Sequence, residues 1–117
     1  GAKEGLEFAI LTNEITQAWT GMTTKEYKNL KGLKKENLRD NMTNLELVLN
    51  MLAETATTEI SNNREPKDFD ENKSVAREGG SVAGNARREI ESKTGNKIIT
   101  SKNAKSLGTK SEPKKLK

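Results

Sequence analysis

Apolar side chains recur at steps of three and four residues in three long stretches of this chain, over residues 6–20, 44–62 and 70–93. That spacing places them on one face of an α-helix, because a helix turns once in about 3.6 residues. Apolar residues make up only 31% of the 117 residues, so any shared core is small and aliphatic. The pattern predicts an all-α fold, a small bundle of four to five helices.

Capping signals predict where these helices begin and end. The segments Thr23-Thr24-Lys25-Glu26 and Thr43-Asn44-Leu45-Glu46 both have the spacing of a capping box, in which a threonine and a glutamate satisfy each other's backbone amides. The first predicts a short helix over 24–31 with Tyr27 and Leu30 facing inward, and a short helix or turn is expected around 36–41. Asp68 or Asp70 is expected to cap the last long helix. Three glycines are placed to end helices: Gly21, Gly32 and Gly95.

The helix over 44–62 is the most apolar, and we expect it to be the central one. Its stripe is Leu45, Val48, Leu49, Leu52, Ala56 and Ile60, widened by Leu47 and Met51. The first helix presents Phe8, Leu11, Ile15, Ala18, Trp19 and Met22. The last presents Val75, Gly79, Val82, Ala83, Ala86 and Ile90, mostly small residues that let helix axes approach closely. Gly79-Gly80 costs this helix about 1 kcal/mol per glycine relative to alanine, which indicates close packing, a break between two helices or a hinge.

Residues 1–95 are expected to form one helical domain. The chain begins with Gly1-Ala2 and no Met, which suggests the C-terminal fragment of a longer protein. Residues 96–117 are expected to be a basic, mobile and largely disordered tail or arm, because residues 93–117 carry eight lysines against one glutamate and few apolar residues. Residues 97–100 fit a short strand or an extended arm.

Several classes of function lack the residues they need. The chain has no cysteine and no histidine, which removes thiolate metal sites and the commonest general base. The acids around Asp68 and Asp70 lack the spacing of a calcium loop, and Gly84 is not followed by the Lys-Ser/Thr pair of a phosphate-binding loop. We therefore expect no enzyme, no cofactor and no metal site. No run of about 18 apolar residues exists, so we expect no membrane partner and a cytoplasmic location.

A cluster of cations over residues 25–39 is the main candidate for a binding surface. Six basic side chains face only two acids there: Lys25, Lys28, Lys31, Lys34, Lys35 and Arg39. Such a cluster suits salt-dependent contacts with nucleic-acid phosphates. A solvated helix–turn–helix surface without a ligand is the competing interpretation, and both stay open. No helix rich in Arg, Asn and Gln follows the turn, so a DNA-reading helix-turn-helix is disfavoured.

A second basic group lies on the polar face of the last helix, at Arg77, Arg87 and Arg88. Arg77 and Arg88 are three helical turns apart and align, so they suit a phosphate or an acidic partner; ordinary bridges to Glu78, Glu89 or Glu91 are the alternative. The only tryptophan and the only tyrosine, at positions 19 and 27, suit base stacking if exposed. In a chain with so few aromatic residues, we expect them to anchor the core instead.

The order and spacing of several short motifs resemble one known family. These are Phe8-Ala9-Ile10, Gly21 with Thr24-Lys25-Glu26, Lys31-Gly32-Leu33-Lys34-Lys35, Thr43-Asn44-Leu45-Glu46-Leu47, the acid-rich segment 54–59, and Val75-Ala76-Arg77-Glu78. Together they resemble the C-terminal region of the DNA-damage-inducible protein D family, over about residues 8–107. Members typically carry a phage antirepressor-like, Bro-N-type domain in front of this region, and this chain does not contain it.

The resemblance implies a bacterial regulatory protein of the DNA-damage (SOS) response that is not an enzyme. It also implies a link to restraint of the recombinase that coats single-stranded DNA. We therefore expect an interaction domain that acts on nucleic acid or on a recombinase–DNA filament. The alternative is a protein-interaction or self-association module, a homodimer for example, that uses the small-residue face Val75–Ile90 and makes no contact with DNA.

Overall fold

The computed structural model describes residues 2–103, and these contain four α-helices, one 3-10 turn and no strand. The helices are α1 (Ala2–Thr20), α2 (Thr24–Leu30), α3 (Asn44–Arg64) and α4 (Phe69–Thr94), with the 3-10 turn at Arg39–Asn41. The all-α prediction is confirmed. The expected helix or turn around 36–41 is this single 3-10 turn.

The helix ends follow the caps predicted from the sequence. Both capping boxes are formed, with Thr23 and Thr43 accepting from the third backbone amide of α2 and α3. Asp68 is the N-cap of α4, and its carboxylate accepts from the amide of Glu71. Gly95 ends α4 in the left-handed conformation, with φ of 77°. These local signals are sufficient because a cap needs only residues within a few positions of one another.

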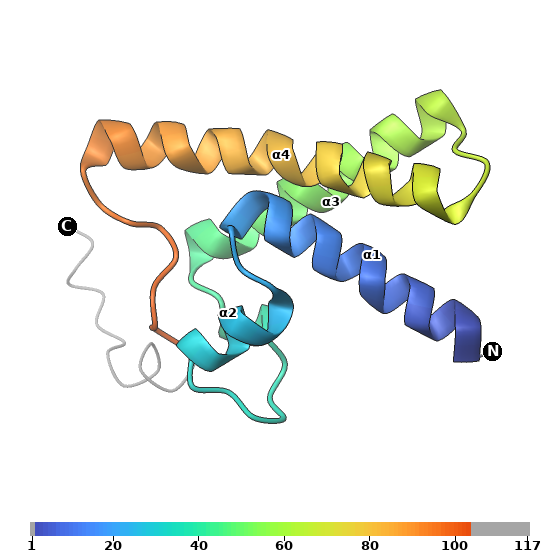
Figure 1. Ribbon diagram of the computed structural model, residues 1–117. Coiled ribbons are helices and arrows are strands. Elements are labelled where there is room, and N and C mark those ends of the chain that lie inside the picture. The colour runs from blue at the N-terminus through green and yellow to red at the C-terminus, as the bar shows by residue number, and fades with distance from the viewer. Residues whose placement is uncertain (1, 104–117) are drawn as a thin grey trace.

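The central helix is α4, and the expectation that the helix over 44–62 would be central is wrong. Figure 1 shows α4 lying across α1 on one side and α3 on the other, and α1 and α3 make few contacts with each other. Only Leu49 and Ala53 among the apolar residues of α3 are buried, whereas Val48 is 56% exposed. An apolar composition therefore did not identify the helix with the most neighbours.

Glycines in the middle of α4 allow its two neighbours to approach closely. A Cβ atom on Gly80 would lie 2.6 Å from the backbone oxygen of Ile15 in α1, and one on Gly79 would lie 2.6 Å from the Cα of Thr57 in α3. Of the three explanations for Gly79-Gly80, close packing is confirmed, because α4 is continuous through this segment. The same contacts place Gly79 and Gly80 inside the domain, whereas Val82 of the same small-residue face is 43% exposed.

The main core cluster lies at one end of α4, around Trp19 and Tyr27, which are both fully buried. Their rings meet edge to face with centroids 6.2 Å apart, so their expected role as core anchors is confirmed and base stacking is excluded. Outside α3, three residues of the predicted apolar faces are instead exposed: Phe8 (72%), Leu30 (40%) and Val82 (43%). Phe8 is exposed because the first half of α1 extends beyond the rest of the bundle (Figure 1).

Residues 96–103 form an irregular arm rather than a strand. Figure 1 shows the arm leaving the end of α4 and running down to α2, and Ile98 is buried in the core cluster. The arm is thus part of the packed body up to Asn103. The tail was expected to be mobile and largely disordered over residues 96–117; residues 96–103 are instead packed against the helices, and residues 104–117 lie outside the described part of the chain.

Candidate nucleic-acid interface

The basic cluster over residues 25–39 separates into a structural part and a surface part. Lys31 belongs to the structural part: its side chain is fully buried and its Nζ lies 2.5 Å from Oε1 of Glu46. Gly32 next to it has φ of 72°, and Leu33 is only 7% exposed. Lys31 as a phosphate-binding residue is therefore a wrong prediction, because its charge is already paired inside the protein.

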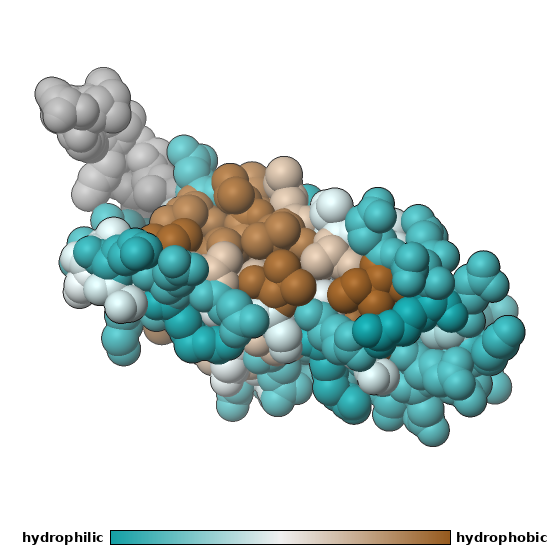
Figure 2. All heavy atoms as spheres, turned by 90° about the horizontal axis from the view of Figure 1, so that it is seen from above, coloured by the Kyte–Doolittle hydropathy of each residue, from teal (hydrophilic) through white to brown (hydrophobic). Residues whose placement is uncertain are grey.

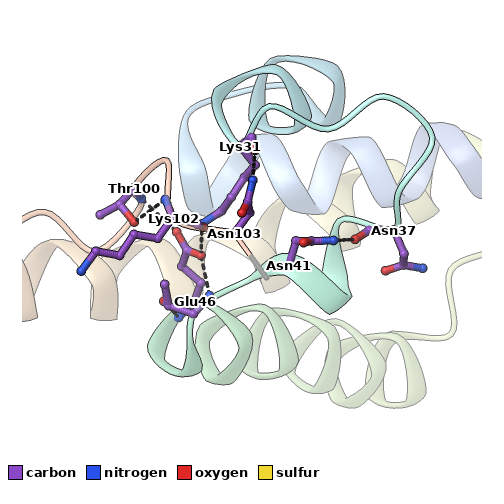
Figure 3. A network of polar contacts seen from close by, with 8 residues as sticks. Lys31, Asn37, Asn41, Glu46, Thr100, Lys102 and Asn103 are labelled. Atoms are coloured by element: carbon purple, nitrogen blue, oxygen red, sulfur yellow. Dashed lines mark hydrogen bonds and ion pairs between the residues drawn. The ribbon is translucent and has the colours of Figure 1, made fainter. Parts of the chain in front are cut away.

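Glu46 is the centre of a buried polar network that ties the arm to the helices (Figure 3). Besides Lys31, its carboxylate accepts from the backbone amides of Thr43 (2.8 Å) and Thr100 (3.0 Å). The Lys31 ammonium donates a second bond to the carbonyl of Lys102, and the Lys31 carbonyl accepts from the Asn103 side chain. A buried ion pair is tolerated only when its remaining hydrogen-bonding groups find partners, and the arm supplies several of them here.

The same network affects Tyr27. Burial raises the pKa of the Tyr27 phenol, and the negative charge of the nearby Glu46 carboxylate raises it further. The Lys31 ammonium lies 5.8 Å from the centre of the Tyr27 ring, which is within the range of a cation–π contact. Tyr27 therefore stays neutral and serves to enclose the ion pair.

The surface part of the cluster lines an open hollow between α1 and the α2 segment. Three lysines contribute to its wall, Lys25, Lys28 and Lys34, and we call this the basic hollow. Lys25 and Lys34 are exposed and Lys28 is half-buried, so the ammonium groups can reach solvent or a ligand. Lys35, also exposed, follows directly in the chain. The hollow therefore gathers four of the six predicted cations at or beside one concave surface.

The polar floor of the hollow was not predicted from the sequence. Asn13, Thr24 and Asn29 complete the lining, with Leu33 as its apolar part. The side-chain oxygen Oδ1 of Asn13 accepts from the backbone amide of Thr24 at 2.8 Å, and this bond joins α1 to the start of α2. The hydroxyl of Thr24 is buried and has no hydrogen-bond partner within the described residues.

Arg39 does not belong to the hollow. Its guanidinium contacts both carboxylate oxygens of Glu54 at 3.0 Å, on α3. Both partners of this pair are about half exposed, at 46% and 47% of the side chain. Arg39 is thus accessible but engaged, and its predicted role in binding has no geometric support.

The arginines of α4 mostly hold the bundle together. Arg77 pairs with Glu14 of α1 at 2.9 Å, and Arg87 donates to the carbonyl of Trp19 and pairs with Glu91. Arg88 donates to the side chain of Asn85 on its own helix. The alternative of ordinary ion pairs on the last helix predicted Glu91 as a partner correctly, but the partner of Arg77 comes from another helix. A joint clamp of Arg77 and Arg88 is therefore unsupported.

The described residues offer neither a metal site nor a membrane-spanning helix. No group of three or more Asp or Glu side chains within residues 2–103 is arranged to hold a metal ion. No helix in that range is both long and apolar enough to cross a membrane. The basic hollow is the described site with the most distinctive charge.

Comparisons with known proteins add no relative to this picture. No protein-family model, curated protein or solved structure matches the chain.

Proposed function

We propose that this chain is a regulatory, non-enzymatic interaction domain of a DNA-damage-inducible protein. It contacts nucleic acid, either bare or within a recombinase–DNA filament in the cytoplasm, through the basic hollow. The observation that carries the proposal is the convergence of Lys25, Lys28 and Lys34 on one concave surface. The motif resemblance supplies the biological context.

Electrostatics would supply most of the affinity. Three or four lysines that neutralise phosphates predict a slope of about −2 to −3 for log affinity against log salt on single strands. Raising salt from about 50 mM to about 200 mM then weakens binding roughly 20- to 60-fold. The hollow has no aromatic side chain in its lining, so we expect little preference among base sequences.

The test compares two double variants of equal charge. Lys34→Glu/Lys35→Glu changes the hollow, whereas Lys3→Glu/Lys67→Glu changes exposed lysines elsewhere. Each replacement removes two charge units, so both variants fall from +4 to 0 (4 − 2 × 2). Fluorescence anisotropy with a labelled single-stranded oligonucleotide is the assay. We expect the first variant to lose at least about tenfold in affinity and the second to lose little.

Equal losses in the two variants would show that only net charge matters, and the hollow would then have no special role. No binding at low salt would remove direct contact with bare DNA. Co-sedimentation with recombinase filaments then tests the filament alone as the partner.

A second candidate function has its own support. Several large apolar side chains of α3 and α4 are exposed, which favours a protein-interaction or self-association module that makes no contact with DNA. It overlaps the predicted small-residue interface only in part, because Gly79 and Ala83 of that face are buried whereas Val82 is exposed.

A further inference from the structure

Exposed apolar side chains form a continuous band along α3 and α4. We define the apolar seam as Leu45, Val48, Met51 and Leu52 of α3 with Val82, Ala86 and Ile90 of α4. The α3 members and Val82 are between 36% and 56% exposed, while Ala86 and Ile90 are half-buried against the core. Figure 2, which looks down on the α4 side, shows apolar residues gathered in one broad band with polar residues flanking it.

The seam is large for a domain of this composition. Eight large hydrophobic residues are exposed within the described part of the chain, and five of them lie in the seam. Only six large ones are buried there, Trp19, Tyr27, Leu33, Leu49, Val75 and Ile98. Isolated soluble domains rarely leave so much of their apolar content in one patch, and such patches usually mark an interaction surface.

Two residues of opposite charge, Glu59 and Lys93, lie on the same helix faces as the seam, one beyond each end. On α3, Glu59 lies seven residues after Leu52 and therefore on the same face, towards the α3–α4 turn. On α4, Lys93 lies seven residues after Ala86, towards the arm. Both side chains are exposed. Glu89, seven residues after Val82, lies on the same face and contacts Lys93 at 3.9 Å, so Lys93 is flanked by a carboxylate of its own chain. A two-fold axis through the middle of the seam would bring Glu59 of each copy to Lys93 of the other.

We propose that the apolar seam is the contact surface of a homodimer, in which the α3–α4 pairs of two copies lie antiparallel as a four-helix bundle. A second copy is the occupant because the seam carries no charge and its ends are complementary to themselves. Nucleic acid fits poorly, since a phosphate backbone needs cations rather than aliphatic side chains. The inference is independent of the proposed function of the basic hollow.

The size of the seam sets the strength of the dimer. With its charged end included, from Leu45 to Glu59, the surface extends about 20 Å along α3, at about 1.5 Å per residue. Two helices about 10 Å apart give it a footprint of roughly 400 Å². This is about half of the roughly 800 Å² that each partner buries in an interface of standard size. We therefore expect a dissociation constant in the micromolar range.

Sedimentation equilibrium of the full chain from about 10 μM to about 1 mM tests the proposal. The unaltered chain should pass from monomer to dimer over this range. Val48→Glu and Val82→Glu should each raise the dissociation constant at least about 100-fold, because each buries two charges. Phe8→Glu is the matched control, since Phe8 is 72% exposed and lies outside the seam. Circular dichroism would verify that each variant is folded.

Charge reversal identifies the partner as a second copy in the proposed orientation. Glu59→Lys and Lys93→Glu should each weaken the dimer several-fold, because each creates like-charge contacts across the axis. The double variant Glu59→Lys/Lys93→Glu should restore affinity to near the original value. A chain that stays monomeric at about 1 mM, an undiminished dimer of Val48→Glu, or a double variant no tighter than the single ones would each overturn the proposal.

Discussion

Replacing Lys31 by methionine should remove much of the stability of this protein. The substitution keeps most of the side-chain length but leaves the Glu46 carboxylate buried without its counter-charge, in a site where both side chains are fully buried. Removing one partner of such a pair typically costs about 3–5 kcal/mol. Small domains have only about 5–15 kcal/mol in total, and a core as small as this one favours the lower end.

Urea unfolding followed by the fluorescence of Trp19 is the assay. Trp19 is the only tryptophan and is completely buried, so its emission reports loss of the core. With a slope of about 1–3 kcal/mol per molar urea, the expected loss lowers the midpoint by roughly 1–5 M. Lys34→Met is the control, because Lys34 is exposed and such changes usually stay within about 0.5 kcal/mol.

A compensating change separates the lost charge pair from lost packing. Lys31→Met/Glu46→Gln removes both charges and keeps an amide oxygen that can accept from one of the two backbone amides, that of Thr43 or that of Thr100, which bond different oxygens of Glu46. It should be more stable than Lys31→Met alone, because no unpaired charge stays buried. The reasoning is refuted if Lys31→Met costs less than about 1 kcal/mol, or if the double variant is no more stable than the single one.

Three further predictions follow from the packing and the caps. Gly80→Ala should destabilise by about 1–3 kcal/mol in thermal unfolding, because its Cβ would lie 2.6 Å from a backbone oxygen of α1. Gly5→Ala, in open space, should instead stabilise by up to about 1 kcal/mol, and equal effects would contradict the close approach of the helices. Tyr27 has a pKa raised by burial and by a neighbouring carboxylate, so the phenol stays neutral in the folded protein. Its contribution to stability is complete below pH about 10 and is lost above it, as the unfolded phenol ionises. In an alkaline titration of this only tyrosine, phenolate absorbance should therefore appear together with unfolding, and its appearance in folded protein would argue against burial. Asp68→Ala removes the acceptor for the Glu71 amide and should cost about 1 kcal/mol, whereas Asp68→Asn should cost less; equal losses would count against capping.

The sequence predicted the helices and their ends because those depend on residues close together in the chain. Both capping boxes and the glycine at the end of α4 belong to this class. Packing order was harder to predict. α4 is poor in large apolar residues, yet its glycines admit a neighbour on each side, and α3 is rich in them but exposes Val48. Spacing alone does not distinguish an apolar face that is covered from one that is open.

The candidate site was predicted in part. The cluster of lysines led to Lys25, Lys28 and Lys34, which the fold does bring together. Lys31 was misassigned because its partners lie 15 and 71 residues away, beyond any local pattern. Thr24 appeared only as part of a capping segment, since an unpartnered hydroxyl is a property of the folded surroundings.

The docking of the arm has a consequence for synthesis on the ribosome. The amide of Thr100 that completes the Glu46 site is made 54 residues after Glu46 itself. At about 5–20 residues per second, roughly 3–11 seconds pass between the synthesis of Glu46 and that of its hydrogen-bond partner in the arm. During that interval the Lys31–Glu46 pair lacks the hydrogen bonds of the arm and is open to water, whereas in the finished protein it is buried. The arm, which is translated after all four helices, is thus the segment that locks the domain.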